Sequence, residues 1–399
     1  MLVQNSVETI IGITRGIKKR LRAITAFRRG LSVAWYVAMV MPTCYFVCPG
    51  YDRPSGGIRV IYRFVDILNS AGISAAVVHR TQNFRCTWFE NETIVLGAKD
   101  VRFQKGDLLV IPEWYRQLIP LMAPGVPHMI FNQNAYEMFS DVPYERGKSA
   151  GVMSADTIGI VGISEDNLRY LRTCFPDKKI DAIRLSIDTE LFQPKAKAKV
   201  IAYMPRKRLK ELNQILHLLE HRNSLEGWEL LPIIGVSESE VAQRLGSAAI
   251  FMVLSAREGI AVPGLEALAS GCVVVGFHGG SGEEYMTSDV AVPIADGEIV
   301  SFVLALESEM ERWVNQDEAQ LDMTRRAVEL VRKKYTRERE RADVVMVFGE
   351  ALERVADMNP GSSFLNWRLV PSTSEQLERK VRPIVKGRRR LRLRMGRNQ

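Results

Sequence analysis

The sequence contains few cysteine and histidine residues, and their spacing excludes several kinds of site. Its 399 residues include five of each. The cysteines form no C-x-x-C pair and no cluster with histidine, and a disulfide framework is not expected in so long a chain. Each cysteine lies in or beside an apolar run, so we expect buried free thiols in a reducing compartment. They are Cys44, Cys48, Cys86, Cys174 and Cys272.

Long hydrophobic runs are also scarce. The chain from Leu31 to Cys48 is nearly all apolar and follows Arg28 and Arg29, but a membrane span needs about 20 such residues. Pro42 interrupts the run, which leads directly into a glycine loop. We therefore predict a buried strand at 43–48 with 31–41 packed ahead of it. A true membrane span is the alternative interpretation.

Charge of one sign is concentrated at the two ends. The chain carries a net charge of +8, with +6 in residues 1–30, ten basic and no acidic residues in 379–399, and −8 between them. This pattern predicts an anionic partner for residues 1–30 and 379–399, and an anionic membrane surface fits best. Nucleic acid is disfavoured by the acidic body and by the lack of an aromatic–basic stripe. A disordered, solubilising role for both ends is the competing interpretation.

The length and the pattern of apolar runs predict two domains of the α/β class. A chain of 399 residues exceeds one ordinary core. Apolar strand-like runs alternate with helical segments from residue 43 to about 350, as expected for parallel sheets covered by helices. The first series of strands is expected at 43–48, 74–79, 93–97, 107–112, 128–132, 157–164 and 182–187. After a linker at Pro194, the second is expected at 200–204, 229–236, 250–255, 272–277 and 290–294.

Two loops that follow predicted strands are suited to bind a phosphate. Gly56 and Gly57 follow the first strand and begin a helix, where glycines allow close backbone approach and free N–H groups face an anion. Arg206, Lys207 and Lys210 follow the strand at 200–204, and such cations suit a diphosphate. A tight turn and a solvated charge run are the alternative interpretations of these loops.

The strongest motif follows the strand at 250–255. Glu258 lies in the loop S-A-R-E-G-I-A-V-P-G-L-E, and Glu266 lies one or two turns into the next helix. A carboxylate there can accept both hydroxyls of a ribose, while the helix N-terminus faces phosphate or sugar oxygens. A further loop, with Gly279 and Gly280, follows the strand at 272–277, and its His278 is expected to be a loop or packing residue.

Together these segments resemble the retaining GT-B glycosyltransferases of the large family 4 type, over residues 43–345. The E-x7-E element of that family corresponds to Glu258 and Glu266, its glycine loop to Gly56–Gly57, and its serine after the last strand of the first domain to Ser164. The family often places a histidine near the sugar, where this chain has Asn132, Gln133 and Asn134, and Ala261 replaces the second glycine of its E-G-x-G motif. The stretch F-N-Q-N-A-Y is similar to a subgroup that acts in surface-polysaccharide assembly, including rhamnosyltransferases.

The resemblance implies an α/β fold of GT-B architecture, with two Rossmann-like domains facing across a cleft and basic terminal extensions. We expect an extension at 1–42, an acceptor-side domain at 43–194, a nucleotide-sugar domain at 195–345 and a C-terminal helix with a basic tail at 346–399.

The same resemblance implies a retaining, metal-independent glycosyltransferase that uses a nucleotide-sugar donor and a glycan or lipid-linked acceptor. We expect it in the cytoplasm, in peripheral contact with the inner face of the membrane. No cofactor or metal is expected, and the sequence contains no D-x-D motif.

The expected roles of the residues follow from the same resemblance. Cations neutralise the leaving diphosphate, Glu258 orients the donor sugar, Glu266 holds the ribose, and loop amides contact the donor. The catalytic set is Glu258, Arg206, Lys207 and Lys210; the donor set is Gly56, Gly57, Ser164, Gly259, Ile260, Ala261, Pro263, Glu266, Gly279 and Gly280; and Asn132, Gln133 and Asn134 face the sugar or acceptor. A catalytically silent GT-B scaffold docked at a membrane, a phosphorylase and an epimerase are the alternatives.

Overall fold

The computed structural model describes residues 41–51, 54–140, 142–146 and 152–369. The predictions for residues 1–30, 31–40 and 379–399 fall outside these ranges. Within them, none of the helices has both the length and the apolar character that a membrane crossing requires.

The first sheet has seven parallel strands in the order β3-β2-β1-β4-β5-β6-β7. Its central strands β1, β4 and β5 are almost wholly buried, because helices cover both of their faces. The strands are β1 (Cys44–Val47), β2 (Ala75–His79), β3 (Val95–Gly97), β4 (Leu108–Pro112), β5 (His128–Phe131), β6 (Thr157–Gly162) and β7 (Ile180–Ala182).

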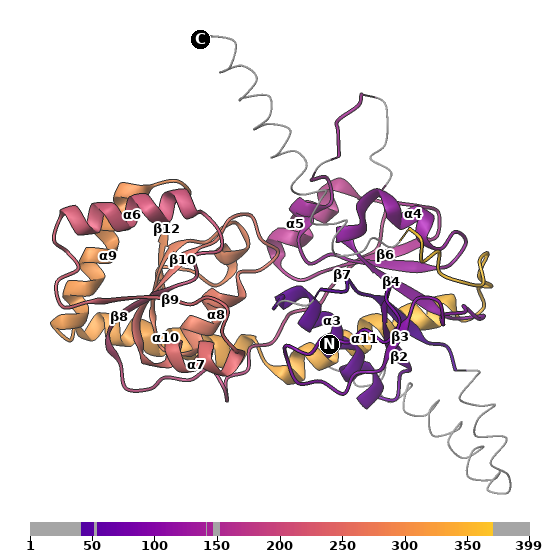
Figure 1. The fold of residues 1–399 in the computed structure, drawn as a ribbon, viewed down its shortest axis with the longest axis horizontal. Coiled ribbons are helices and arrows are strands. Elements are labelled where there is room, and N and C mark those ends of the chain that lie inside the picture. The colour runs from indigo at the N-terminus through magenta and orange to yellow at the C-terminus, as the bar shows by residue number, and fades with distance from the viewer. Residues whose placement is uncertain (1–40, 52–53, 141, 147–151, 370–399) are drawn as a thin grey trace, which may run out of the picture. The chain divides into compact units, whose positions relative to one another are not determined.

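Helices from both ends of the described chain cover this sheet. Helix α3 (Gly56–Ser70) buries Ile61, Phe64, Val65 and Leu68, which the helical repeat places on one face. Helix α11 (Arg337–Val355) returns from the second half and packs against α3, β4 and β7, as Figure 1 shows. The remaining helices here are η1 (Glu113–Leu118), α4 (Ile119–Met122), η2 (Ala135–Glu137) and α5 (Glu165–Cys174).

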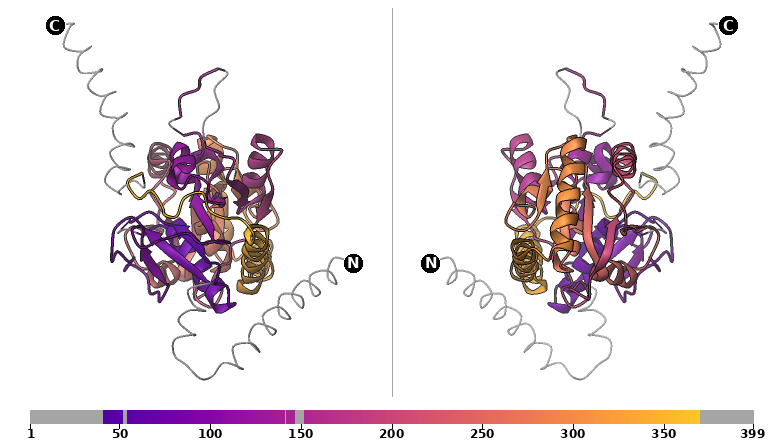
Figure 2. Two further views of the ribbon diagram at one scale, coloured as in Figure 1. Left: turned by 90° about the vertical axis from the view of Figure 1, so that its right-hand side faces the viewer. Right: turned by 90° about the vertical axis from the view of Figure 1, so that its left-hand side faces the viewer.

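The second sheet has five parallel strands in the order β12-β11-β10-β8-β9. One hydrophobic cluster fills the face under α6 and α9. Residues of α7, α8 and α10 belong to a second cluster, which covers the other face and continues into the first sheet. Figure 2 shows the ribbon of the two halves from either end. The strands are β8 (Ala198–Tyr203), β9 (Glu229–Pro232), β10 (Ala248–Leu254), β11 (Val273–Phe277) and β12 (Val292–Ile294). The helices are α6 (Leu209–His221), α7 (Glu238–Ser247), α8 (Val262–Ala269), η3 (Ser281–Glu284), α9 (Ile299–Val314) and α10 (Glu318–Lys334).

One predicted strand is displaced. The strand expected at 182–187 lies at 180–182 instead, and the following residues form a connector between the two sheets. The amide of Ser186 lies 3.3 Å from a carboxylate oxygen of Glu340, and the amide of Ile187 donates to the carbonyl of Tyr335 at 2.9 Å. The connector alternates buried and polar residues as a strand does. The amide of Ile183 still bonds to the carbonyl of Gly162 in β6, but beyond it the amides bond to the segment that returns from the second half of the chain.

The prediction of buried thiols is wrong at one position. Cys174 is exposed at the end of α5, whereas Cys44, Cys48, Cys86 and Cys272 are buried. Cys174 is the last residue of α5, beyond the buried Leu168 and Leu171, and the neighbouring apolar run does not cover it there. The predicted domain bounds stay a prediction, and the bound at 345 falls within α11.

Candidate functional site

The loops after β8, β10 and β11 meet at one edge of the second sheet. These strands are parallel neighbours, so their carboxyl ends lie together, where open α/β sheets bind ligands. Nζ of Lys207, after β8, lies 2.7 Å from Oε2 of Glu258, after β10. Glu258 also forms an isolated parallel bridge with Gly280, after β11. The structure therefore brings together three of the loops that the sequence singled out.

The basic loop after β8 uses its cations differently from the prediction. Arg208, which the sequence interpretation did not select, donates from Nε to the carbonyl of Ser255 at 2.6 Å and pairs with Asp296. Its guanidinium also lies 4.9 Å from the ring centre of Phe277. Arg206 and Lys210 are exposed and form no ion pair with any described residue. Arg208 thus fastens the loops together.

Helix α8 presents its N-terminus and Glu266 to this edge. Pro263 lies in its first turn, preceded by Gly259, Ile260 and Ala261. The hydroxyl of Tyr285 donates to the carbonyl of Ala261 at 2.8 Å and fixes the loop. A Cβ on Gly264 would lie 2.5 Å from that hydroxyl, so this position requires glycine.

Glu266 is a buried carboxyl group. Its residue is 7% exposed, and burial raises its pKa to about 7 although Arg59 and Arg63 favour the charged form. A carboxyl group with such a pKa changes its charge near neutral pH. Perturbed groups of this kind gather at functional sites, and here the geometry points to the same position.

Loops of the first sheet contact the loop around Glu258. Gly57, in the first turn of α3, accepts a hydrogen bond at its carbonyl from Nε2 of Gln133 at 3.1 Å. The backbone of Gln133 lies so close to Gly259 that a Cβ there would be 1.5 Å from the Gln133 carbonyl oxygen. Asn134 donates from Nδ2 to the carbonyl of Arg257 at 3.2 Å. The loops at Gly57, at 133–134 and at 257–259, all three predicted as site loops, are therefore joined by direct contacts.

Two predicted residues have internal partners. Asn132 is fully buried, and its Oδ1 accepts a hydrogen bond from Nδ2 of Asn167 at 2.7 Å. Ser164 is buried and caps α5, because its hydroxyl accepts from the amide of Asn167 at 3.2 Å. Both side chains therefore hold the first-sheet loops together by hydrogen bonds to Asn167.

The loop after β11 is held by its own residues. Gly279 and Gly280 both have positive φ, and a Cβ on Gly279 would lie 2.7 Å from Cβ of Ser255. Nδ1 of His278 accepts a hydrogen bond from the amide of Gly280 at 3.2 Å, so it acts as the loop residue that we expected.

Glu113 was missed by the sequence interpretation. It directly follows β4 and is buried, and its Oε1 accepts a hydrogen bond from the amide of Asn134 at 2.8 Å. Burial raises its pKa to about 7. Its place after a predicted strand was the available signal, although it stands outside any motif.

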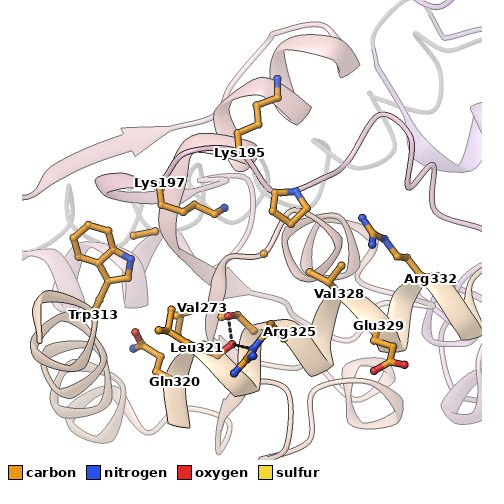
Figure 3. Close-up of a pocket in the computed structure, with 14 residues that line it drawn as sticks. Lys195, Lys197, Val273, Trp313, Gln320, Leu321, Arg325, Val328, Glu329 and Arg332 are labelled. Carbon is orange, nitrogen blue, oxygen red and sulfur yellow. Dashed lines mark hydrogen bonds between the residues drawn. The ribbon is translucent and has the colours of Figure 1, made fainter. Parts of the chain in front are cut away.

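A cavity of about 520 Å³ lies away from these loops, at the amino ends of β10 and β11. Figure 3 shows Trp313 on one side of it and Arg332 on the other. None of the predicted site residues lines it, and the ligand-binding edge of an open parallel sheet is the opposite one. We therefore place the functional site at the loops.

Comparisons with known proteins agree with this arrangement. No family model matches the chain. An alpha-1,6-glucosyltransferase from Actinobacillus pleuropneumoniae serotype 7 (strain AP76) is 28% identical over 287 residues, which cover 66% of this chain and 82% of that protein. The chain is a glycosyltransferase.

Solved structures show its fold. Sucrose-phosphate synthase from Thermosynechococcus elongatus has a TM-score of 0.59 at 12% identity, covering 78% of this chain and 100% of that one. The pneumococcal O-GlcNAc transferase GtfA, in complex with UDP and GlcNAc, has a TM-score of 0.53 at 9% identity, covering 79% of this chain and 99% of that one. The lipopolysaccharide outer core galactosyltransferase WaaB has a TM-score of 0.53 at 13% identity, covering 77% of this chain and 99% of that one. The fold of this glycosyltransferase is GT-B, as the sequence predicted.

Proposed function

We propose that this glycosyltransferase is retaining and metal-independent, and moves glucose from a nucleotide-diphosphate donor to a glycan or lipid-linked acceptor of cell-surface polysaccharide or glycolipid synthesis. The observation that carries the proposal is the set of three loops that places Lys207, Glu258 and Glu266 at one edge of the second sheet. The family 4 resemblance, with its E-x7-E element, supports the retaining mechanism.

The sugar and the linkage rest on the relative from Actinobacillus, which is named for α-1,6 glucosyl transfer. Nucleotide-diphosphate glucose commonly carries its glucose in the α configuration, so an α-linked product requires net retention. In that reaction the bond between the anomeric carbon and the diphosphate oxygen breaks, and a bond to the acceptor hydroxyl oxygen forms. The hydroxyl proton leaves with the departing diphosphate.

The leaving diphosphate would be neutralised by the basic loop after β8. Arg206 and Lys210 are exposed, and Lys207 is held by Glu258 at 2.7 Å. Cations that are positioned where charge develops stabilise the transition state. We assign them this role in place of a metal ion.

The donor would lie between α8 and the loops of the first sheet. Glu266 would accept the ribose hydroxyls, and Glu258 with the amides of Gly259 to Ala261 would orient the sugar. Gln133 and Asn134 contact the loop that carries Glu258, and this proximity supports their assignment to the sugar or acceptor side. Gln133 and Asn134 would face the sugar or the acceptor.

Membrane contact is the remaining part of the proposal. The basic segments 1–30 and 379–399 would bind the anionic inner leaflet, where lipid-linked acceptors lie, with about 1 kcal/mol for each cation near the surface. Deletion of 379–399 should weaken co-sedimentation with vesicles that contain phosphatidylglycerol, and deletion of both segments should abolish it. Unchanged co-sedimentation would contradict this role.

A binding screen tests the donor site directly. UDP, GDP, dTDP and their sugars, including glucose and rhamnose donors, would be titrated by calorimetry with and without EDTA. We expect one nucleotide to bind, insensitive to EDTA, and to lose affinity in Glu266→Ala. Transfer to an acceptor with release of nucleoside diphosphate would exclude a phosphorylase or epimerase. No binding at all would instead favour a silent scaffold.

A further inference from the structure

Arg59, in the first turn of α3, stands between two carboxylates of the other sheet's helices. Its guanidinium pairs with Glu238, the first residue of α7, and NH2 lies 3.8 Å from Oε1 of Glu266 in α8. The Arg59 side chain is 23% exposed and that of Glu266 is 9% exposed. An arginine from the first-sheet domain therefore reaches the carboxylate that we expect to hold the ribose.

The charges that act on Glu266 come from α3 and α7. They are Arg59 and Arg63, which favour the charged carboxylate, and Glu238, which disfavours it. Arg63 is committed elsewhere, since its NH2 lies 2.6 Å from Oε1 of the buried Glu340. Arg59 is consequently the principal compensating charge for Glu266.

We propose that Arg59 is a positioning residue for nucleotide binding, which keeps the Glu266 carboxylate charged and aimed at the ribose hydroxyls of the donor. This inference rests on the proposed role of Glu266. A charged carboxylate accepts a hydrogen bond from each of the two hydroxyls, whereas a protonated one has a hydrogen in place of one acceptor site. Arg59 thereby links the first-sheet domain to a donor group bound by the second.

Glu238 acts on the pKa of Glu266 in the opposite direction to Arg59, and this difference allows the proposal to be tested. Loss of the Arg59 charge should make Glu266 harder to ionise, and loss of the Glu238 charge should make it easier. A residue that merely braces the two helices would weaken binding in the same direction in both variants. The direction of the change therefore separates an electrostatic role from a structural one.

The experiment measures the affinity of the bound nucleoside diphosphate against pH by calorimetry. In the wild type, affinity should fall as the pH decreases through about 7, the pKa of Glu266. In Arg59→Gln the midpoint should rise by about one pH unit, which weakens binding about fivefold at the wild-type midpoint. Arg59→Lys should stay close to the wild type, and Glu238→Gln should move the midpoint down.

Arg222→Gln is the matched control, because it removes an arginine whose surface partner Glu307 lies far from these residues in the second-sheet domain. Its midpoint should equal that of the wild type. An unchanged midpoint in both Arg59→Gln and Glu238→Gln, while Glu266→Ala abolishes binding, would overturn the role of Arg59 alone. Failure of Glu266→Ala to weaken binding would overturn the proposed ribose site itself. Should Arg59→Gln not fold, Glu238→Gln decides, since a structural brace predicts no downward shift.

Discussion

Nζ of Lys207 lies 2.7 Å from Oε2 of Glu258, so the two residues expected to contact the diphosphate and the adjoining sugar of the donor are already paired. The lysine comes from the loop after β8 and the glutamate from the loop after β10. Their side chains are 33% and 16% exposed, respectively, which leaves the ammonium accessible to a diphosphate. Donor binding would therefore exchange one anionic partner of Lys207 for another, and each residue orients the other before the donor arrives.

Removal of either charge from this pair should lower turnover. We expect Lys207→Met to reduce kcat/KM by about 100-fold, the scale seen when one electrostatic group of a transition state is lost. Glu258→Gln should reduce kcat by at least about tenfold without weakening the binding of the nucleoside diphosphate, because Glu258 is assigned to the sugar and its charge competes with the diphosphate for Lys207. Steady-state kinetics with the identified donor measures both. Full turnover by Glu258→Gln would disprove its assigned role.

The close approach of Gly259 to Gln133 predicts a second effect. A methyl group at Gly259 would collide with the Gln133 carbonyl, so Gly259→Ala must push the two loops apart. We expect activity to fall by about 100-fold, since small displacements of a donor site are costly. Gly349→Ala, within α11, is the control: its nearest atom would lie 3.9 Å away, and stability should rise by up to about 1 kcal/mol. Equal activity in both variants would show that the loop contact is unimportant.

How far the sequence predicted this site depends on the residue. The strands could be located because apolar runs bounded by glycine, proline or charge are typical of buried parallel strands, and the loops that follow them mark the ligand-binding edge. Glu258, Lys207 and Glu266 come from such loops or from the helix just after one. Residues 183–187 show the same alternation, but the amides of Arg184, Ser186 and Ile187 pair with a segment about 150 residues away in the sequence, which no local pattern reveals.

The directions in which individual side chains point also could not be predicted from the local sequence. Three cations stand in a row at 206–208, and the left-handed backbone of Arg208, with φ of 50°, turns that residue inward against Ser255 and Phe277. Asn132 follows a predicted strand as Gln133 does, yet Asn167 draws its side chain into the interior. Both outcomes depend on tertiary neighbours.

Glu113 should make stability depend on pH. Its pKa is raised to about 7 in the folded protein, above the ordinary value near 4.5, so the folded state binds more protons between these values. The contribution to stability is therefore present below about pH 4.5 and is lost as pH rises through 7. In the wild type, the free energy of unfolding should decrease by on the order of 2 kcal/mol between pH 5 and 8 because of Glu113, and Glu113→Gln should remove this decrease.

Urea unfolding across that range measures the effect, and Glu266 contributes with the same sign. Glu113→Gln should therefore remove part of the pH dependence of the free energy of unfolding, and the double variant with Glu266→Gln should remove more of it. Glu190→Gln is a suitable control, because Glu190 is exposed after the connector between the two sheets. A wild-type profile that does not fall towards pH 8, or one that Glu113→Gln leaves unchanged, would contradict the prediction.

Lys197 joins the ends of two helices that frame the site. Its Nζ donates to the carbonyl of Leu245, near the end of α7, at 3.0 Å and to that of Ser270, just after α8, at 2.7 Å. Burial lowers the pKa of this lysine, yet a cation at helix C-termini is favoured by the free carbonyls and by the helix dipole. We expect Lys197→Met to lower the free energy of unfolding by about 1–3 kcal/mol, because both carbonyls lose their partner.

Lys199→Met is the matched control, since Lys199 is exposed two residues further along the chain and should leave stability within about 0.5 kcal/mol of the wild type. Loss of the Lys197 contacts should also weaken nucleotide binding, because α8 carries Glu266. This effect should be smaller than the loss of stability, because Lys197 contacts Ser270, beyond the end of α8, and not Glu266 itself. An unchanged unfolding midpoint in Lys197→Met would mean that desolvation of the ammonium offsets its hydrogen bonds. A loss of binding far larger than the loss of stability would place Lys197 among the residues that shape the donor site.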